Sequence, residues 1–129
     1  MVKHISSGSP FETDFAYARA VVDGEMIYVS GTTGYDYQTM EMPDDVAQQC
    51  RNTLDTISQA LQDAGSSLRD VLRVRYYLTD AGYMGSIGPV LASYFGETRP
   101  AATMVIAELI KAEMKIEIEV TARIGAHGS

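Results

Sequence analysis

Residues 114–124 carry the most regular pattern in the chain, and this pattern limits the fold more than any other feature. Apolar and polar residues alternate there without a break. The apolar set is Met114, Ile116, Ile118, Val120, Ala122 and Ile124, and the polar set is Lys115, Glu117, Glu119, Thr121 and Arg123. Because successive side chains of a strand point to opposite faces, the stretch predicts a strand with one buried face.

The segment before it, residues 101–107, is almost entirely apolar or small. This composition predicts a strand that is buried on both faces. Residues 111–113 are then expected to form the turn between the two strands.

Three further stretches predict strands. Residues 15–22 and 26–30 flank an Asp-Gly pair that suits a tight hairpin turn, and residues 71–79 alternate like a strand. The first 13 residues are expected to be irregular apart from a short strand at 2–5, and residues 31–42 are expected to form a loop. In that loop Gly31 and Gly34 mark positions of unusual backbone angles or of close approach.

Two helices are predicted between these strands. Residues 43–64 begin with Pro-Asp-Asp, precede Gly65 and carry an apolar stripe at helical spacing, namely Val46, Cys50, Leu54, Ile57 and Leu61. Asp80 is expected to cap the second helix, which ends at Gly96 and has the stripe Met84, Ile87, Leu91 and Tyr94. Its interior Gly85, Gly88 and Pro89 predict a bend, or a start as late as Pro89.

This order of elements predicts an α+β domain spanning residues 1–129, with a mixed sheet and two helices on one face. Two successive right-handed crossovers put both helices on the same side, which leaves the other face of the sheet uncovered. That face mixes Tyr, Val and Met with Arg and Glu and is too apolar for open water. We therefore expect it to be buried against other copies of the chain.

Composition narrows the class of protein. The chain has 129 residues, 46% of them hydrophobic, and a formal net charge of −7, which argues against nucleic-acid binding. It lacks the roughly eighteen consecutive apolar residues of a membrane span and shows no secretory signal, so we expect no membrane partner and a cytoplasmic location. The single cysteine, Cys50, excludes an internal disulfide and lies on a helix stripe, where a small buried side chain is expected.

Few residue patterns in the chain indicate chemistry. Glu117 and Glu119 form either a solvated polar face or, if that face is buried between subunits, a carboxylate that orients water. Arg99 is either a surface charge or a carboxylate-binding guanidinium. His4 and His127 are expected at the surface. Because no metal-ligand spacing, phosphate loop or nucleophile elbow is present, neither a cofactor nor a metal is expected.

With these patterns in view, residues 3–124 resemble the RidA family, also called the YjgF or L-PSP endoribonuclease-like family. The resemblance is carried by Tyr17 in FAYARAV, Ser30 and Gly31 in YVSGTTG, the helix VAQQCRNTLDTISQALQDAG, the strand VLRVRYYLTD, the segment RPAATMV and, above all, MKIEIEVTAR. It implies a chorismate-mutase-like fold and a homotrimer with a central barrel and ligand clefts between subunits. It also implies a cofactor-free enzyme that hydrolyses small enamines and imines to keto acids and ammonia.

The resemblance also assigns roles to residues. Glu117 would position the attacking water, and Tyr17 would contribute its hydroxyl from the hairpin strand. Ser30 and Gly31 would shape the wall of the cleft. The backbone groups of Thr103 and Met104 would lie where the substrate is anchored.

The chain departs from the family pattern at Ala102, where deaminating members carry an arginine that clamps the substrate carboxylate. Arg99 is three positions away, and strand alternation sends it to the opposite face unless the chain bends at Pro100. Two readings follow. The first is a RidA-type deaminase with an altered substrate range, and the second is a non-catalytic trimer that binds a small ligand or a protein. A ribonuclease role, implied by the older family name, fits poorly with an acidic chain.

Overall fold

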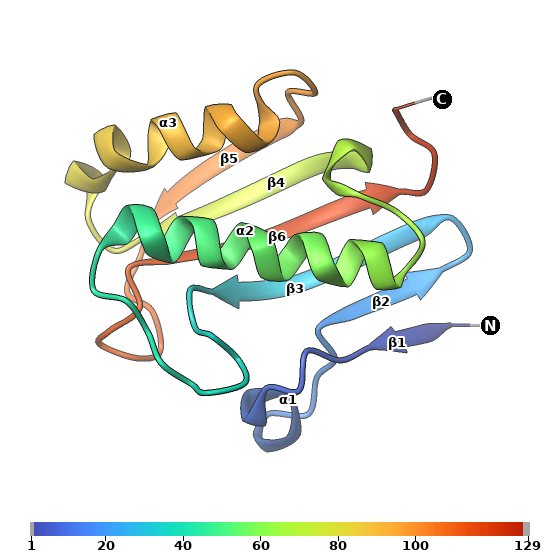
Figure 1. The fold of residues 1–129 in the computed structure, drawn as a ribbon, viewed down its shortest axis with the longest axis horizontal. Coiled ribbons are helices and arrows are strands. Elements are labelled where there is room, and N and C mark those ends of the chain that lie inside the picture. The colour runs from blue at the N-terminus through green and yellow to red at the C-terminus, as the bar shows by residue number, and fades with distance from the viewer. Residues whose placement is uncertain (1, 128–129) are drawn as a thin grey trace.

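The computed structural model describes residues 2–127 and contains one mixed six-stranded sheet, in the order β1-β2-β3-β6-β4-β5. Only the pair β4 and β5 is parallel. Figure 1 shows the long helices α2 and α3 side by side on one face of this sheet. The elements are β1 (Lys3–Ile5), α1 (Pro10–Asp14), β2 (Ala20–Asp23), β3 (Met26–Thr33), α2 (Val46–Asp63), β4 (Val71–Leu78), α3 (Met84–Phe95), β5 (Ala101–Ile106) and β6 (Ile116–Arg123), with short 3-10 turns at Leu68–Asp70 and Ala81–Tyr83. The α+β architecture with both helices on one face is confirmed.

Helix α2 follows its sequence signals closely. Asp45 caps it by accepting a hydrogen bond of 2.9 Å from the backbone N–H of Gln48, so the helix begins at Val46 rather than at Pro43. The five stripe residues named above are all buried between the helix and the sheet. Cys50 is fully buried, and burial raises the pKa of its thiol to about 12, which confirms its role as a small core residue.

Helix α3 differs from its predicted form. Asp80 caps the 3-10 turn that precedes it, and the helix then runs from Met84 through Pro89 without a late start. Its buried side is formed by Ile87, Val90 and Phe95, whereas Met84 is exposed. Leu91 and Tyr94 of the predicted stripe pack against the same core while partly buried, so only Met84, at the first position of the helix, departs from the predicted face.

The last two strands were predicted correctly in part. Strand β6 lies in the middle of the sheet, and Ile116, Ile118, Val120 and Ala122 are buried beneath the helices as expected. Strand β5, however, does not pair with β6, because β4 lies between them. The prediction that residues 101–107 are buried on both faces is therefore wrong within one chain, where β5 is an exposed edge strand.

The N-terminal region also corrects the sequence reading. Residues 10–14 form the short helix α1, and the hairpin strand begins at Ala20 rather than at residue 15. Ala16 takes a left-handed φ of 59°, which separates the helix from the strand. The tight turn itself is confirmed, because Asp23 pairs with Met26 around Gly24, whose φ is 61°.

Asp70 fixes the C-terminal segment to the end of α2. Its side chain is 3% exposed and accepts hydrogen bonds from the Ser66 hydroxyl at 2.5 Å and the Gly125 N–H at 3.2 Å, and it also contacts the His127 ring. Burial alone would raise the pKa of Asp70, but these hydrogen bonds outweigh it and lower the pKa to about 2. His127 is exposed, as the sequence predicted, and its contact with Asp70 is an addition that the sequence did not indicate.

We predict that Asp70→Asn lowers the free energy of unfolding at pH 7 by about 2 kcal/mol, because a carboxyl with a depressed pKa stabilises the fold when ionised. This stabilisation is present above the ordinary pKa of 3.8 and is lost as the pH falls through about 2. Urea unfolding at pH 7, 4 and 3 measures it, with the exposed Asp63→Asn as the control. Equal stability of the two variants at pH 7 would contradict the prediction.

Among residues 2–127, no helix is long and apolar enough to cross a membrane.

Candidate functional site

A bulge in β3 organises the site. Val29 pairs with Val120 and Thr32 pairs with Ile118, so β3 has one residue more than β6 over this stretch. The extra residue lies at Ser30–Gly31. The Ser30 hydroxyl donates to the Ala18 carbonyl at 2.7 Å, which joins the bulge to the loop that follows α1.

Gly31 and Glu117 approach each other closely across this bulge. A Cβ atom placed on Gly31 would lie 2.9 Å from the Cδ atom of Glu117, a distance that real side chains do not tolerate. A side chain at this position would therefore displace the carboxylate of Glu117 from the place that it occupies. The close approach predicted for this glycine is confirmed.

Glu117 lies in a cavity of about 340 Å³ on the side of the bulge. The cavity is lined by Phe11, Phe15, Tyr17, Ser30, Gly31, Thr33, Tyr37, Ile110, Met114 and Glu117. Its outer residues are apolar, and Phe15 and Ile110 are 63% and 71% exposed. A small molecule held there would meet one carboxylate, several hydroxyl groups and an apolar rim.

The two glutamates of β6 have different surroundings. The carboxylate of Glu119 accepts a hydrogen bond of 2.5 Å from the Tyr77 hydroxyl and lies 3.7 Å from the guanidinium of Arg75. Within residues 2–127, no hydrogen bond reaches the carboxylate of Glu117. Burial raises the pKa of Glu117, the negative charge of Glu119 raises it further, and the positive charge of Arg19 opposes both. Glu119 thus belongs to a partly exposed polar face and is held by its neighbours. The carboxylate of Glu117 is available to a water molecule or a ligand.

Tyr17 lines the same cavity. It belongs to the loop between α1 and β2 and not to the hairpin strand in which the sequence analysis had predicted it. Its hydroxyl oxygen lies 3.3 Å from the Arg19 guanidinium, which donates to it. Burial raises the pKa of this phenol, and the charge of Arg19 counteracts part of the rise. The group is therefore a neutral hydroxyl at ordinary pH.

Arg19 is the main residue of this region that the sequence reading did not include. Its side chain is 1% exposed and lies against the rings of Tyr17 and Tyr37. The sequence did contain an indication of this residue, because Arg19 is the one charged residue among the aromatic, apolar and small residues of the segment FAYARAV. Such a residue in a buried strand or loop needs partners, which is an indication of a polar network.

The other half of the expected site lies elsewhere in the chain. Ala102 and Arg99 line a separate hollow of about 350 Å³ between α3 and the β4–β5 edge. Arg99 takes a left-handed φ of 49° before Pro100, lies outside β5, and lines the same hollow as Ala102. Thr103 and Met104 lie on the exposed strand β5 beside Arg75 and Tyr76. One chain thus brings together Glu117, Tyr17, Ser30 and Gly31 but not these four residues.

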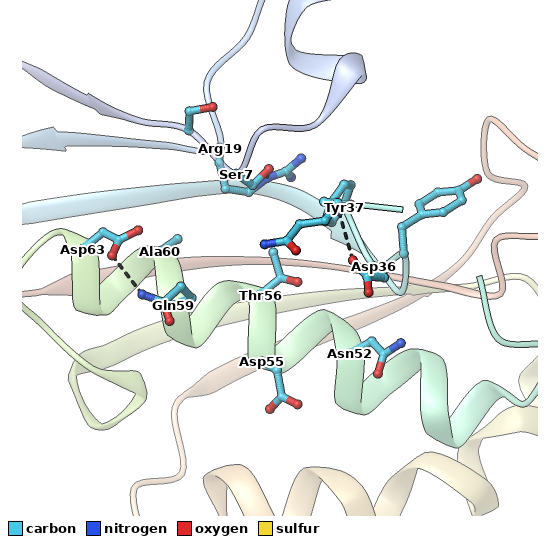
Figure 2. Close-up of a pocket in the computed structure, with 13 residues that line it drawn as sticks. Ser7, Arg19, Asp36, Tyr37, Asn52, Asp55, Thr56, Gln59, Ala60 and Asp63 are labelled. Atoms are coloured by element: carbon cyan, nitrogen blue, oxygen red, sulfur yellow. Dashed lines mark hydrogen bonds between the residues drawn. The ribbon is translucent and has the colours of Figure 1, made fainter. Parts of the chain in front are cut away.

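A third hollow, of about 500 Å³, lies between α2 and residues 35–38 (Figure 2). It is lined by several acidic and amide side chains. Asp55 already accepts from the Tyr94 hydroxyl at 2.7 Å, and Asp63 accepts from the Gln59 amide at 2.9 Å. In the part of the chain that the structure describes, no group of three or more His, Cys, Asp or Glu residues is placed to hold a metal ion.

Comparison with known proteins adds to this geometry. The family model described as Endoribonuclease L-PSP matches residues 9–124. A RutC family protein of Pyrococcus horikoshii is 35% identical over 107 residues, which cover 82% of this chain and 85% of that protein.

Solved structures agree in fold. Rv2704 of Mycobacterium tuberculosis, described as a member of the YjgF/YER057c/UK114 family, has 39% sequence identity and a TM-score of 0.87, and the match covers 96% of this chain and all of that one. The YjgF gene product of Escherichia coli has 29% identity and a TM-score of 0.85, with 94% and 98% of the two chains covered. Sequence and fold therefore point to the same group of proteins.

Proposed function

Because the chain belongs to the RidA/YjgF (L-PSP) family, we propose that it is a cofactor-free hydrolytic deaminase of small reactive imines and enamines. The observation that carries the proposal is the carboxylate of Glu117, which is partly withdrawn from water, accepts no hydrogen bond from residues 2–127 and is open to a cavity of small-molecule size. A positioned carboxylate with a raised pKa is suited to act as a general base.

The proposed reaction needs only water and side chains. Glu117 accepts a proton from a water molecule as the water oxygen attacks the C=N carbon, and the Tyr17 hydroxyl donates a hydrogen bond to the imine nitrogen. Glu117 passes this proton to the nitrogen, which gives a neutral carbinolamine. Glu117 then accepts the proton of the carbinolamine hydroxyl and delivers it to the nitrogen as the C–N bond breaks, so that ammonia leaves and a carbonyl group remains. One imine and one water thus give one carbonyl compound and one ammonia.

The proposal includes assembly as a homotrimer in the cytoplasm. Strand β5 is an exposed edge, and the uncovered face of the sheet carries Tyr28, which is 49% exposed. Both features are expected where copies of the chain meet. In this arrangement β5 of a neighbouring copy supplies Ala102, Thr103 and Met104 to the cavity that holds Glu117. Sedimentation of the purified protein at the mass of three chains is the expected result.

Ala102 sets the expected substrate range. Without an arginine at this position the cleft lacks a bidentate partner for a carboxylate, a contact worth about 1.5–3 kcal/mol. We therefore propose that imines lacking a carboxylate are accepted at least as well as 2-imino acids. The apolar residues Phe15 and Ile110 at the rim favour the same kind of ligand.

Ala102→Arg tests this range. We predict that it raises kcat/KM for a 2-imino acid by about tenfold to a hundredfold and leaves an uncharged imine unchanged, because a charge-assisted contact acts only on the carboxylate. Initial rates of carbonyl release from imines generated in situ measure the effect. Ala102→Met is the control for side-chain size. Equal gains with Met and Arg would contradict the clamp explanation.

The alternative is a non-catalytic family member that binds a small ligand or a protein, and Ala102 is the observation that favours it. The wild-type protein distinguishes the two. A deaminase accelerates hydrolysis of at least one of the two imines, whereas a binding module accelerates neither.

A further inference from the structure

We propose that Arg19 is the positioning residue of this site, which fixes the bulge at Gly31 and directs the hydroxyl hydrogen of Tyr17 toward the cavity. The inference deepens the proposed function and rests on it for its kinetic readout. It concerns a residue that is closed off from solvent and does not itself line the cavity of Glu117.

The guanidinium binds the bulge directly. One of its terminal nitrogens donates to the Gly31 carbonyl at 2.9 Å and to the Thr32 hydroxyl at 3.0 Å. The bulge is the point where β3 leaves its regular register against β6, and its geometry determines the space for the Glu117 carboxylate. Two charge-assisted hydrogen bonds from a buried fork hold such a segment in one conformation.

The other terminal nitrogen acts on Tyr17. It donates to the phenol oxygen at 3.3 Å, so that oxygen serves as an acceptor toward Arg19. A hydroxyl whose lone pair is engaged in this way turns its own hydrogen elsewhere. Since Tyr17 lines the cavity, its O–H is left to donate to a ligand there.

A second chain of contacts holds Arg19 from the opposite side. Its Nε donates to the Ser7 hydroxyl at 3.1 Å, and that hydroxyl donates to the Glu12 carboxylate at 2.6 Å. Figure 2 shows Ser7 and Arg19 next to each other across from α2. The Tyr37 ring lies 4.8 Å from the guanidinium carbon and closes the remaining side. The side chain is thus held in one position by the N-terminal segment, β3 and the loop after it.

Arg19 also acts on Glu117 through its charge. The charged groups that shift the pKa of Glu117 are Glu119 on the same strand, which raises it, and Arg19, which lowers it. A neutral residue at position 19 therefore leaves Glu117 protonated up to a higher pH.

The test compares Arg19→Gln, Arg19→Lys and Arg69→Gln, the last being an exposed arginine paired with Glu97 at the surface. The pKa of Glu117 is measured by following the NMR signal of its side-chain carboxyl carbon as the pH is changed, and this measurement needs no substrate. We expect its pKa to rise in Arg19→Gln and to stay close to wild type in Arg19→Lys and Arg69→Gln. With an imine substrate, we expect kcat of Arg19→Gln to fall on the order of 10- to 100-fold with a smaller change in KM.

Arg19→Lys separates charge from geometry. It is expected to retain the wild-type pKa of Glu117 and yet lose most of the rate, because an ammonium cannot reproduce the fork. If Arg19→Gln does not fold, Arg19→Lys and Tyr17→Phe carry the test, and adding Tyr17→Phe to Arg19→Lys is expected to lower the rate by little more.

An unchanged pKa of Glu117 in folded Arg19→Gln, or additive losses in the double variant, would overturn the inference. Absence of turnover in the wild-type protein would instead overturn the proposed function. The backbone amide NMR shifts at Gly31 and Thr32 in Arg19→Lys would then decide the role of Arg19 in fixing the bulge, since an unchanged pair of shifts would contradict it.

Discussion

Glu117→Gln is expected to lower kcat for imine hydrolysis by about 10²- to 10⁴-fold, the range typical of a lost general base. Glutamine has nearly the same shape but cannot accept a proton from water. Because burial raises the pKa of Glu117, the ionised form is disfavoured in the folded protein, and stability falls as the pH rises through that pKa. Glu117→Gln is therefore expected to be at least as stable as wild type at pH 7 while losing activity.

Initial rates and thermal unfolding of the same preparations measure both effects. Glu119→Gln is the matched comparison on the same strand. It is expected to remain active and to shift the acid limb of the pH–rate profile to lower pH, because removal of the like charge lowers the pKa of Glu117. A Glu117→Gln protein that is both active and less stable would assign this carboxylate to structure alone.

Gln49→Leu is expected to lower the free energy of unfolding by about 3 kcal/mol. Gln49 is fully buried on α2, and its side-chain amide donates to the Pro43 carbonyl at 2.8 Å and the Glu113 carbonyl at 3.0 Å. Its oxygen accepts from the backbone N–H of Lys115 at 2.9 Å. Leucine fills a similar volume but leaves three backbone groups without these partners, and the start of β6 loses its attachment to the helix.

Urea unfolding at one fixed protein concentration measures this loss, since the stability of the proposed trimer would depend on concentration. Gln62→Leu, an exposed glutamine on the same helix, is the control and is expected to change stability by less than about 0.5 kcal/mol. Similar losses of stability in the two variants would contradict this explanation, because Gln62 has no buried hydrogen bonds to lose.

The elements that the sequence predicted well are those with a strong period. The alternation around Ile118 and the stripe around Leu54 each bury one face, and the structure places both as expected. Local chemistry was also sufficient for the Asp23-Gly24 turn. Periodicity identifies an element and its buried face because both follow from chain geometry.

Pairing between strands was harder to predict. An apolar stretch such as residues 101–107 suits a central strand, yet β5 lies at the edge of the sheet, because neighbours are determined by contacts between distant segments. Within one chain its exposure has no local explanation. Contacts with other copies of the chain, as proposed here, would provide one.

In the candidate site too, local sequence predicted some residues, whereas others depend on contacts between distant segments. The KIEIE segment predicted Glu117, but its difference from Glu119 depends on partners such as Tyr77 that lie far away in the sequence. The roles of Arg19 and Gln49 depend in large part on hydrogen bonds to distant residues, such as Gly31 for Arg19 and Glu113 for Gln49. Such connections leave no periodic signal, so a buried polar residue is recognised only when its surroundings are known.

The most direct test of the proposed deaminase activity is the rate of ammonia release from an imine generated in situ, with and without the purified wild-type protein at neutral pH. We expect a rate that increases in proportion to protein concentration, for an imine without a carboxylate as well as for a 2-imino acid. A rate equal to that in buffer for both substrates would contradict it.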